Sequence, residues 1–222
     1  DPVADRGQVR RTGQDLPAGF HDTTGDALDP HDAARDQAVR LPGEQRADAV
    51  VMNADFGNAI TKLVPNHLRR RWTDEKVAKK DFSCSTFMLY LGVEGTYPQL
   101  AHHNIYVAKD YRRNLDEIER QHVLSEEPSF YIENPVRTDP TMAPPGHSAL
   151  YVLLPVTHQH PNVDWNQEKM RYRSVALRQL AKLGLTDIEQ RIRFERIVTP
   201  ADWESKVDVY RGATFNLAHS FR

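Results

Sequence analysis

Hydrophobic and polar positions change their period several times along the chain, and the changes predict alternating strands and helices. Order is expected to begin near Ala38, with a short strand and a turn at Pro42-Gly43. The run FSCSTFMLYLGV at residues 82–93 predicts the clearest strand, because aromatic, Thr and branched side chains favour a pleated sheet. Further apolar or alternating runs predict strands at residues 49–52, 104–108, 129–133 and 149–156.

Apolar residues that recur about once per helical turn predict helices between these strands. The helical segments are residues 55–72, with Pro65 as a kink or break, and residues 111–123, 169–183 and 201–207. Gly184 is expected to end the third helix, and residues 187–194 to continue it or to form the next one. The alternation favours an α/β or α+β domain, built as a mixed β-sheet with packed helices.

The first part of the chain has a different character. Residues 1–37 mix Asp, Arg, Gly, Gln and Pro with few large apolar side chains, and they show neither a helical nor a strand period. Too little apolar surface is present to offset the entropy of an ordered chain, so disorder is predicted. The alternative is a segment translated out of frame or from a damaged gene. Asp1 stands where Met is expected, which indicates a chain without its natural start.

Charge and composition exclude several classes of protein. Lys plus Arg is 29 and Asp plus Glu is 31, which gives a net charge of -2 and argues against a dedicated nucleic-acid binder. The single cysteine, Cys84, allows no intrachain disulfide and favours a reducing, cytoplasmic compartment. No apolar run approaches the roughly 20 residues that a membrane-spanning helix needs.

Cofactor and metal motifs were sought next. The chain has no GxGxxG after a strand, no GxxxxGK[ST], no HExxH and no clustered cysteines. The sequence therefore predicts no phosphate cradle and no metal site.

The pair His102-His103 lies between two predicted strands. Adjacent residues of an extended segment point to opposite faces, so the pair is not expected to bind one metal ion. One interpretation is a half-buried histidine beside an exposed one. The alternative is a polar group at a substrate cavity that handles a proton.

Other charged and proline-rich segments also allow two interpretations. The carboxylates of KDYRRNLDEIE, Asp110 among them, are expected to pair with arginines on a solvated helix face, or to hide a catalytic carboxylate. The connector that begins at Asp139-Pro140 predicts a rigid turn, and such a turn could shape the mouth of a pocket. The basic cluster at residues 67–72 is a solvated helix end or a contact for an anionic membrane surface.

Several segments, taken together and in order, resemble one known family. They are ADAVVMNADF, STFMLYLGV, YPQLAHHNIYVAKDYRRNLDEI, NPVRTDPTMAPPGHSALYVLLPV with a later DW, and VTPADWESKVDVYRGATFNLAHS. These segments resemble the bacterial-type phytoene desaturases and their carotenoid relatives, over nearly everything after residue 46. Residues 1–37 do not resemble the family region expected before them.

The resemblance implies an FAD-dependent oxidoreductase of the amine-oxidase-like class, which removes a hydride and a proton from saturated bonds of a polyene precursor. It implies a partial FAD/NAD(P)-binding-like flavoprotein domain at residues 38–80, a substrate domain at 81–198, and a return toward the flavin domain at 199–222. Asn53, Ala54 and Asp55 match an N-A-D of the family and are expected to border the cofactor. The family's glycine-rich flavin loop is expected to lie outside this chain.

The resemblance also implies a hydrophobic polyene substrate, held by shape and apolar burial, and peripheral contact with a membrane surface. Candidates for a proton carrier are His102, His103, Asp110 and Asp139. The chain alone is expected to be inactive, as part of a parent enzyme. Two alternatives stay open, which are a non-catalytic module that binds an apolar ligand or membrane surface, and an inactive fragment.

Overall fold

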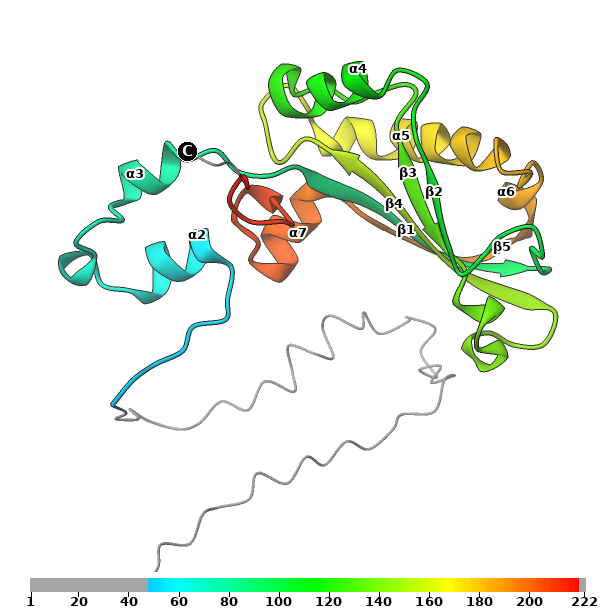
Figure 1. The fold of residues 1–222 in the computed structure, drawn as a ribbon, viewed down its shortest axis with the longest axis horizontal. Coiled ribbons are helices and arrows are strands. Elements are labelled where there is room, and N and C mark those ends of the chain that lie inside the picture. The colour runs from blue at the N-terminus through cyan, green and yellow to red at the C-terminus, as the bar shows by residue number, and fades with distance from the viewer. Residues whose placement is uncertain (1–47, 220–222) are drawn as a thin grey trace, which may run out of the picture. The chain divides into compact units, whose positions relative to one another are not determined.

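The computed structural model describes residues 48–219, which belong to one compact unit that spans residues 47–222 (Figure 1). The predicted disorder of residues 1–37 and the predicted strand near Ala38 lie outside the described residues.

A five-stranded sheet, in the order β2-β3-β4-β1-β5, organises this unit, and every pairing in it is antiparallel. The strands are β1 Ser85–Glu94, β2 His103–Tyr106, β3 Phe130–Glu133, β4 His147–Val156 and β5 Ile192–Val198. The ten-residue strands β1 and β4 pair over their whole lengths, so the two clearest apolar runs of the sequence form the centre of the sheet. The α/β prediction, a sheet with packed helices, is confirmed.

Helices and single turns connect the strands. The helices are α2 Phe56–Asn58, α3 Asp74–Ala78, α4 Tyr111–Asp116, α5 Trp165–Ala181, α6 Ile188–Arg191 and α7 Pro200–Val207. The shorter turns are η1 Ala59–Leu63, η2 Asn66–Leu68, η3 Glu117–Gln121, η4 Pro135–Arg137, η5 Pro140–Met142 and η6 Tyr210–Gly212. Within residues 48–219, no helix combines the length and the apolar character needed to cross a membrane.

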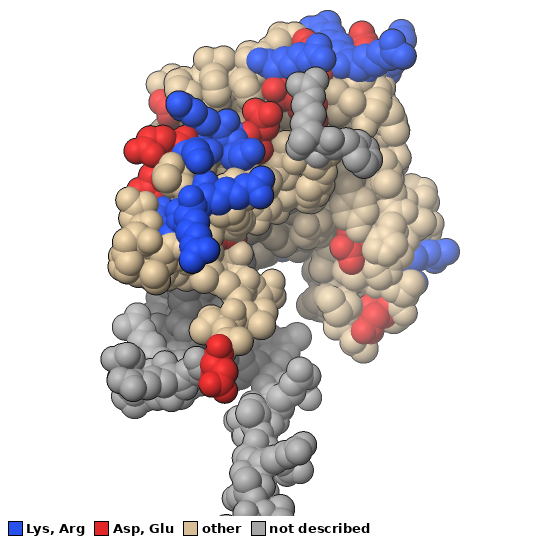
Figure 2. Space-filling model, turned by 60° about the vertical axis from the view of Figure 1, so that its left-hand side comes forward, with Lys and Arg blue, Asp and Glu red and all other residues tan. Residues whose placement is uncertain are grey.

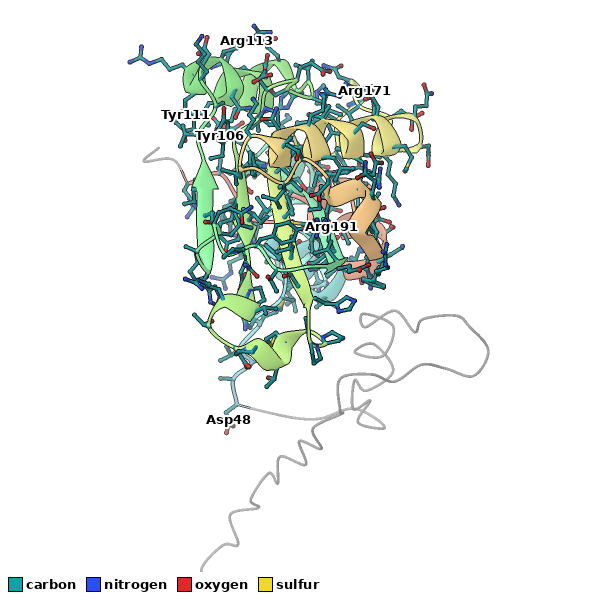
Figure 3. The ribbon with its side chains drawn as sticks, turned by 90° about the vertical axis from the view of Figure 1, so that its right-hand side faces the viewer. Asp48, Tyr106, Tyr111, Arg113, Arg171 and Arg191 are labelled. Atoms are coloured by element: carbon teal, nitrogen blue, oxygen red, sulfur yellow. The ribbon has the colours of Figure 1, made fainter. Side chains whose placement is uncertain are left out.

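The core lies between the sheet and α5, which runs along one face of it (Figure 1). Alternate residues of β1 and β4 point toward α5 and are buried, among them Phe87, Leu89 and Val152. From α5, Tyr172 meets the ring of Phe87 edge to face, with centroids 5.2 Å apart. Side chains fill the space between these two layers (Figure 3). On the face of β1 that points away from α5, Thr86 and Met88 are buried, whereas Tyr90 is only half-buried.

An ion-pair cluster joins α5 to the edge of the sheet. Arg173, whose side chain is 13% exposed, binds Glu195 of β5 at 2.8 Å and Glu189 of α6 at 2.7 Å. Because Glu195 lies across from the core residue Leu91, its carboxylate would face apolar side chains without this partner.

Two sequence predictions in this unit were wrong. Residues 49–52 form no strand, and Val50 and Val51 are 79% and 94% exposed. A strand needs a partner, and residues 48–219 offer none there. Residues 192–194 are not helical, because α6 ends at Arg191 and β5 follows directly. This segment pairs with the free edge of β1 as an antiparallel strand. The pairing outweighs the helical preference of its residues.

The predicted helix at 55–72 is only partly present. Pro65 separates η1 from η2, so single turns replace one continuous helix. Helix α3 was not predicted from the sequence. Its N-cap is Thr73, whose hydroxyl accepts a hydrogen bond from the amide of Lys76.

Candidate functional site

A row of half-buried tyrosines lies on the face of the sheet that points away from α5. Tyr90 of β1 is directly opposite Tyr151 of β4, and their rings meet edge to face with centroids 5.4 Å apart. Tyr131 of β3 continues the row, with its ring 6.0 Å from that of Tyr151. We call these three residues the tyrosine row. Leu153, which pairs with Tyr131, adds apolar surface beside it.

Burial raises the pKa of each phenol in the tyrosine row. For Tyr131 the nearby carboxylate of Glu133 raises the pKa further. All three side chains are therefore neutral at physiological pH. The row offers aromatic surface and hydroxyl groups but no charge of its own.

A polar cluster lies at the end of this row, on the edge of the sheet. Nε2 of His102 is 3.1 Å from Oε1 of Glu133, and its Nδ1 is 2.5 Å from Oγ1 of Thr138. Nδ1 of His103 is 2.6 Å from the hydroxyl of Tyr131. The two imidazole rings lie 4.2 Å apart, centroid to centroid.

The expectation that His102 and His103 point to opposite faces was therefore wrong. The alternation rule applies between residues of one strand, and β2 begins only at His103. His102 lies in the bend before the strand, which turns its ring to the same side. Strand alternation does explain Tyr131 and Glu133, which are two residues apart on β3 and share a face.

The two candidate aspartates have no hydrogen bond to the histidine pair among the described contacts, and each caps a short helix. Asp110 accepts a hydrogen bond from the amide of Arg113 and begins α4. Asp139 accepts hydrogen bonds from the amide and the hydroxyl of Thr141, and these bonds hold the pKa of its carboxyl below the usual value. A carboxylate with a lowered pKa is a weaker base.

Asn53, Ala54 and Asp55 lead into α2. The backbone around Asn53 and Ala54 is exposed, whereas the carboxylate of Asp55 caps α2 through the amide of Asn58. The same carboxylate accepts a hydrogen bond of 3.2 Å from the amide of Tyr210. Asp55 therefore links the start of α2 to η6 near the end of the chain.

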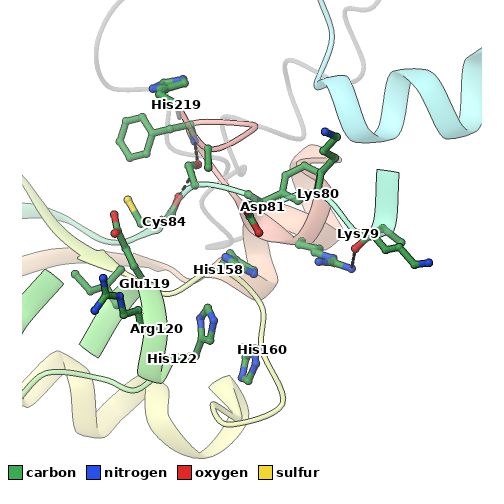
Figure 4. A pocket seen from close by; sticks show the side chains of 17 residues that line it. Lys79, Lys80, Asp81, Cys84, Glu119, Arg120, His122, His158, His160 and His219 are labelled. Carbon is green, nitrogen blue, oxygen red and sulfur yellow. Dashed lines mark hydrogen bonds between the residues drawn. The ribbon is translucent and has the colours of Figure 1, made fainter. Parts of the chain in front are cut away.

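A cavity of about 830 Å³ forms where four segments meet (Figure 4). They are the chain entering β1, the end of η3, the loop after β4 and the returning residues 211–219. The entering and returning chains pair there, with the amide of Ser83 donating to the carbonyl of Asn216 at 2.9 Å. The cavity thus lies beside two paired segments, the one that leads into β1 and the returning residues 211–219.

Three of the four histidines that line this cavity lie against one another, whereas the fourth is His219. The ring of His122 stacks on that of His160 at 4.2 Å and meets His158 edge to face at 5.3 Å. Burial lowers the pKa of His122 and of His158, and the neighbouring imidazoles lower both further. Burial also raises the pKa of the Cys84 thiol, so this cysteine is protonated and a poor nucleophile.

The lowered pKa values predict that acid destabilises the fold. An unfolded histidine binds a proton near its ordinary pKa of 6.5, whereas folded His122 and His158 bind theirs only at lower pH. The unfolded chain therefore takes up more protons, and the free energy of unfolding falls as the pH drops below about 6.5. Urea unfolding at about pH 7.5 and pH 5.5 measures this fall.

The double variant His122→Asn/His158→Gln is expected to lose part of this pH dependence. Asparagine suits position 122, because its φ is positive at 52°. The control is His67→Gln, which replaces an exposed histidine and should keep the wild-type slope. Equal slopes in all three proteins would contradict the prediction.

The described residues do not form a dinucleotide cradle. Such a cradle needs a glycine-rich turn between a strand and a helix in a parallel βαβ unit, and the strands of residues 48–219 pair only in the antiparallel sense. Within this part of the chain, Asn53 to Asp55 remain the residues predicted to border a cofactor.

Several residues of these sites were missed from the sequence. The tyrosine row follows from strand alternation once the register of β1, β3 and β4 is known, and the sequence alone does not give that register. His158 and His160 are two residues apart, a spacing that could have drawn attention to them. His122 joins them only through the tertiary fold.

Comparison with known proteins gives three similar relatives. A 4,4'-diapophytoene desaturase (4,4'-diapolycopene-forming) from Methylomonas sp is 42% identical over 190 residues, covering 85% of this chain and 37% of the relative. An all-trans-zeta-carotene desaturase from Myxococcus xanthus is 41% identical over 218 residues, covering 96% of this chain and 41% of the relative. A zeta-carotene-forming phytoene desaturase from the same organism is 40% identical over 193 residues, or 86% and 37% of the two chains. No family model matches.

The structure defines an α/β domain, with an antiparallel sheet that is packed by helices on one face and lined with aromatic side chains on the other. The chain is similar to part of the carotenoid desaturases: the three relatives are 40–42% identical over 85–96% of it, and it spans about two fifths of their length. One alignment covers 96% of the chain, so the similarity to a desaturase reaches into residues 1–37. The prediction that these residues do not resemble the family was therefore wrong.

Proposed function

We propose that this chain forms the substrate-facing part of an FAD-dependent carotenoid desaturase, which dehydrogenates carbon–carbon bonds of a polyene in carotenoid biosynthesis. The observation that carries the proposal is the 42% identity to a 4,4'-diapophytoene desaturase over 85% of this chain. FAD is the expected cofactor, and residues outside 48–219 would supply its main cradle.

The tyrosine row supports the substrate class. A polyene hydrocarbon offers almost nothing to hydrogen-bond, so a site recognises it by shape and apolar burial. Tyr90, Tyr131 and Tyr151 are only half-buried and, together with Leu153, leave apolar area for a ligand to cover. Each Å² of apolar area removed from water contributes about 25 cal/mol. We propose that the polyene lies against this face.

A proton carrier among His102, His103, Asp110 and Asp139 remains part of the proposal. His102 and His103 are favoured, because they lie at the end of the tyrosine row and exchange hydrogen bonds with Tyr131 and Glu133. Asp110 and Asp139 are less favoured, since each carboxylate already caps a short helix.

Peripheral contact with a membrane, on its cytoplasmic side, is also proposed. Leu63 and Leu68 are each 63% exposed, and a basic group that includes Arg71 and Lys80 follows them along the chain. Both cations lie over the ring of Trp72, at 5.2 and 5.6 Å. Figure 2 shows Lys and Arg side chains gathered on one face, with acidic ones among them. Apolar side chains within a basic group favour an anionic lipid surface. Equal sedimentation with anionic and zwitterionic vesicles would contradict this proposal.

The decisive test uses the intact gene. The DNA on either side of this chain, read in all frames, is expected to encode a GxGxxG segment after an N-terminal strand. The intact product should carry a flavin with its yellow absorption and should lengthen the conjugation of a carotenoid precursor in a host that makes one. Intact upstream sequence without such a motif would overturn the proposal.

A non-catalytic module that binds an apolar ligand is the second candidate function. The exposed aromatic face favours it as well, because that face needs no flavin in order to bind a hydrocarbon. This candidate predicts polyene binding by the intact product without flavin absorption. Stoichiometric FAD that bleaches under reductant would exclude it.

A further inference from the structure

We propose that His102, His103 and Glu133 form a binding site for one divalent transition-metal ion of the zinc type. One ligand atom from each residue lies within 4.8 Å of the other two. His103 and Glu133 are directly opposite each other on β2 and β3, and His102 joins them from the bend before β2. This proposal does not depend on the desaturase assignment.

The hydrogen bonds around His102 call for a cation. Thr138 donates its hydroxyl proton to the carbonyl of Pro135, at 3.2 Å, so its oxygen is left to accept from Nδ1–H of His102. Nε2 is then the ring nitrogen that lies beside Oε1 of Glu133, 3.1 Å away. Two lone pairs at that distance repel, unless a proton or a metal ion lies between them.

His103 has a similar arrangement of hydrogen-bonding groups around its ring. The hydroxyl of Tyr131 lies 3.3 Å from Oε2 of Glu133 and 2.6 Å from Nδ1 of His103; when it donates to Glu133, its oxygen accepts from Nδ1–H of His103. In both imidazoles Nδ1 is therefore within hydrogen-bond distance of a hydroxyl group. In known metal sites, the ring nitrogen that does not bind the metal makes a hydrogen bond, and this bond orients the histidine.

The ligand types indicate which ions would bind. Two imidazoles and one carboxylate suit zinc, iron, nickel or copper in the divalent state, whereas calcium and magnesium prefer all-oxygen sites. The side chains of His102 and Glu133 are 28% and 31% exposed, so water can complete the coordination. A bound ion would tie the short edge strand β2 to β3 and, through Thr138, to the turn η4.

Zinc titration of the 222-residue chain, followed by calorimetry, tests the proposal. The double variant His102→Gln/His103→Gln and the single variant Glu133→Gln are each expected to weaken zinc binding by more than about tenfold. Circular dichroism should show unchanged folding, because all three side chains lie at the edge of the sheet. Cobalt(II) should give the absorption of a nitrogen- and oxygen-ligated site in the wild type but not in these two variants.

Two matched controls exclude other histidines. His147→Gln replaces a histidine of the same sheet outside the site, and His122→Asn/His160→Gln changes the cavity cluster; both should bind zinc as the wild type does. The proposal is overturned if the His102→Gln/His103→Gln variant binds as tightly as the wild type, or if only the cavity variant loses binding. It is also overturned if no saturable binding occurs at about 100 µM zinc.

Discussion

Replacing Phe87 with alanine is expected to lower the free energy of unfolding by about 3–5 kcal/mol. Phe87 is fully buried in the first part of β1, and its ring stacks on Trp165 at 5.7 Å and meets Tyr172 edge to face. The substitution removes the aromatic contacts between the sheet and α5 and leaves a cavity that the rigid strand pair cannot close. A domain with a total stability of about 5–15 kcal/mol would lose a large part of it.

Urea unfolding, followed by circular dichroism, measures the loss as a shift in midpoint at constant slope. The matched control is Phe194→Ala, because Phe194 lies on the neighbouring strand β5 and is 51% exposed. This control should cost less than about 1 kcal/mol. Similar losses in the two variants would show that the core does not lie between β1 and α5.

The elements predicted best from the sequence are those whose own apolar pattern determines their structure. β1 and β4 combine branched and aromatic side chains over ten residues each, and α5 repeats its apolar residues at helical spacing. Such segments keep their conformation in almost any context. Their burial then follows from the period, as the full burial of Leu89 and Val175 shows.

The elements predicted wrongly depend on partners that are distant in the sequence. Residues 49–52 look like a buried strand, yet Val51 is 94% exposed, because no strand pairs with it among the described residues. Residues 192–194 were predicted to be helical, yet they belong to β5, which pairs with β1 about one hundred residues away in the sequence. Local composition cannot report either outcome.

The candidate site also combines residues that the sequence identified with residues that only the tertiary fold brings to them. His102 and His103 were identified from the sequence, whereas Glu133 and Thr138 come to them only through the β2–β3 pairing and the turn that follows it. Hydrogen bonding among these four residues requires a bend at His102, and the sequence pattern predicted an extended segment there.

Replacing Gly212 with alanine is the other substitution expected to have a large effect, about 2–5 kcal/mol. Gly212 has a φ of +62°, a conformation that costs an L-residue about 1–2 kcal/mol. A Cβ there would lie 2.3 Å from the carbonyl oxygen of Pro200, at the start of α7. Because that oxygen belongs to backbone, it cannot swing aside, and overpacking adds about 1–3 kcal/mol.

Gly146→Ala separates these two costs. Gly146 has a φ of +75°, but a Cβ there would meet nothing within 4 Å. This control should therefore show the conformational cost alone, about 1–2 kcal/mol. Gly212→Ala should also disturb the cavity, since the carbonyl of the preceding Arg211 accepts a hydrogen bond from the amide of Gln159, between His158 and His160. Equal urea midpoints for the two variants would mean that the returning chain does not pack against α7 as described.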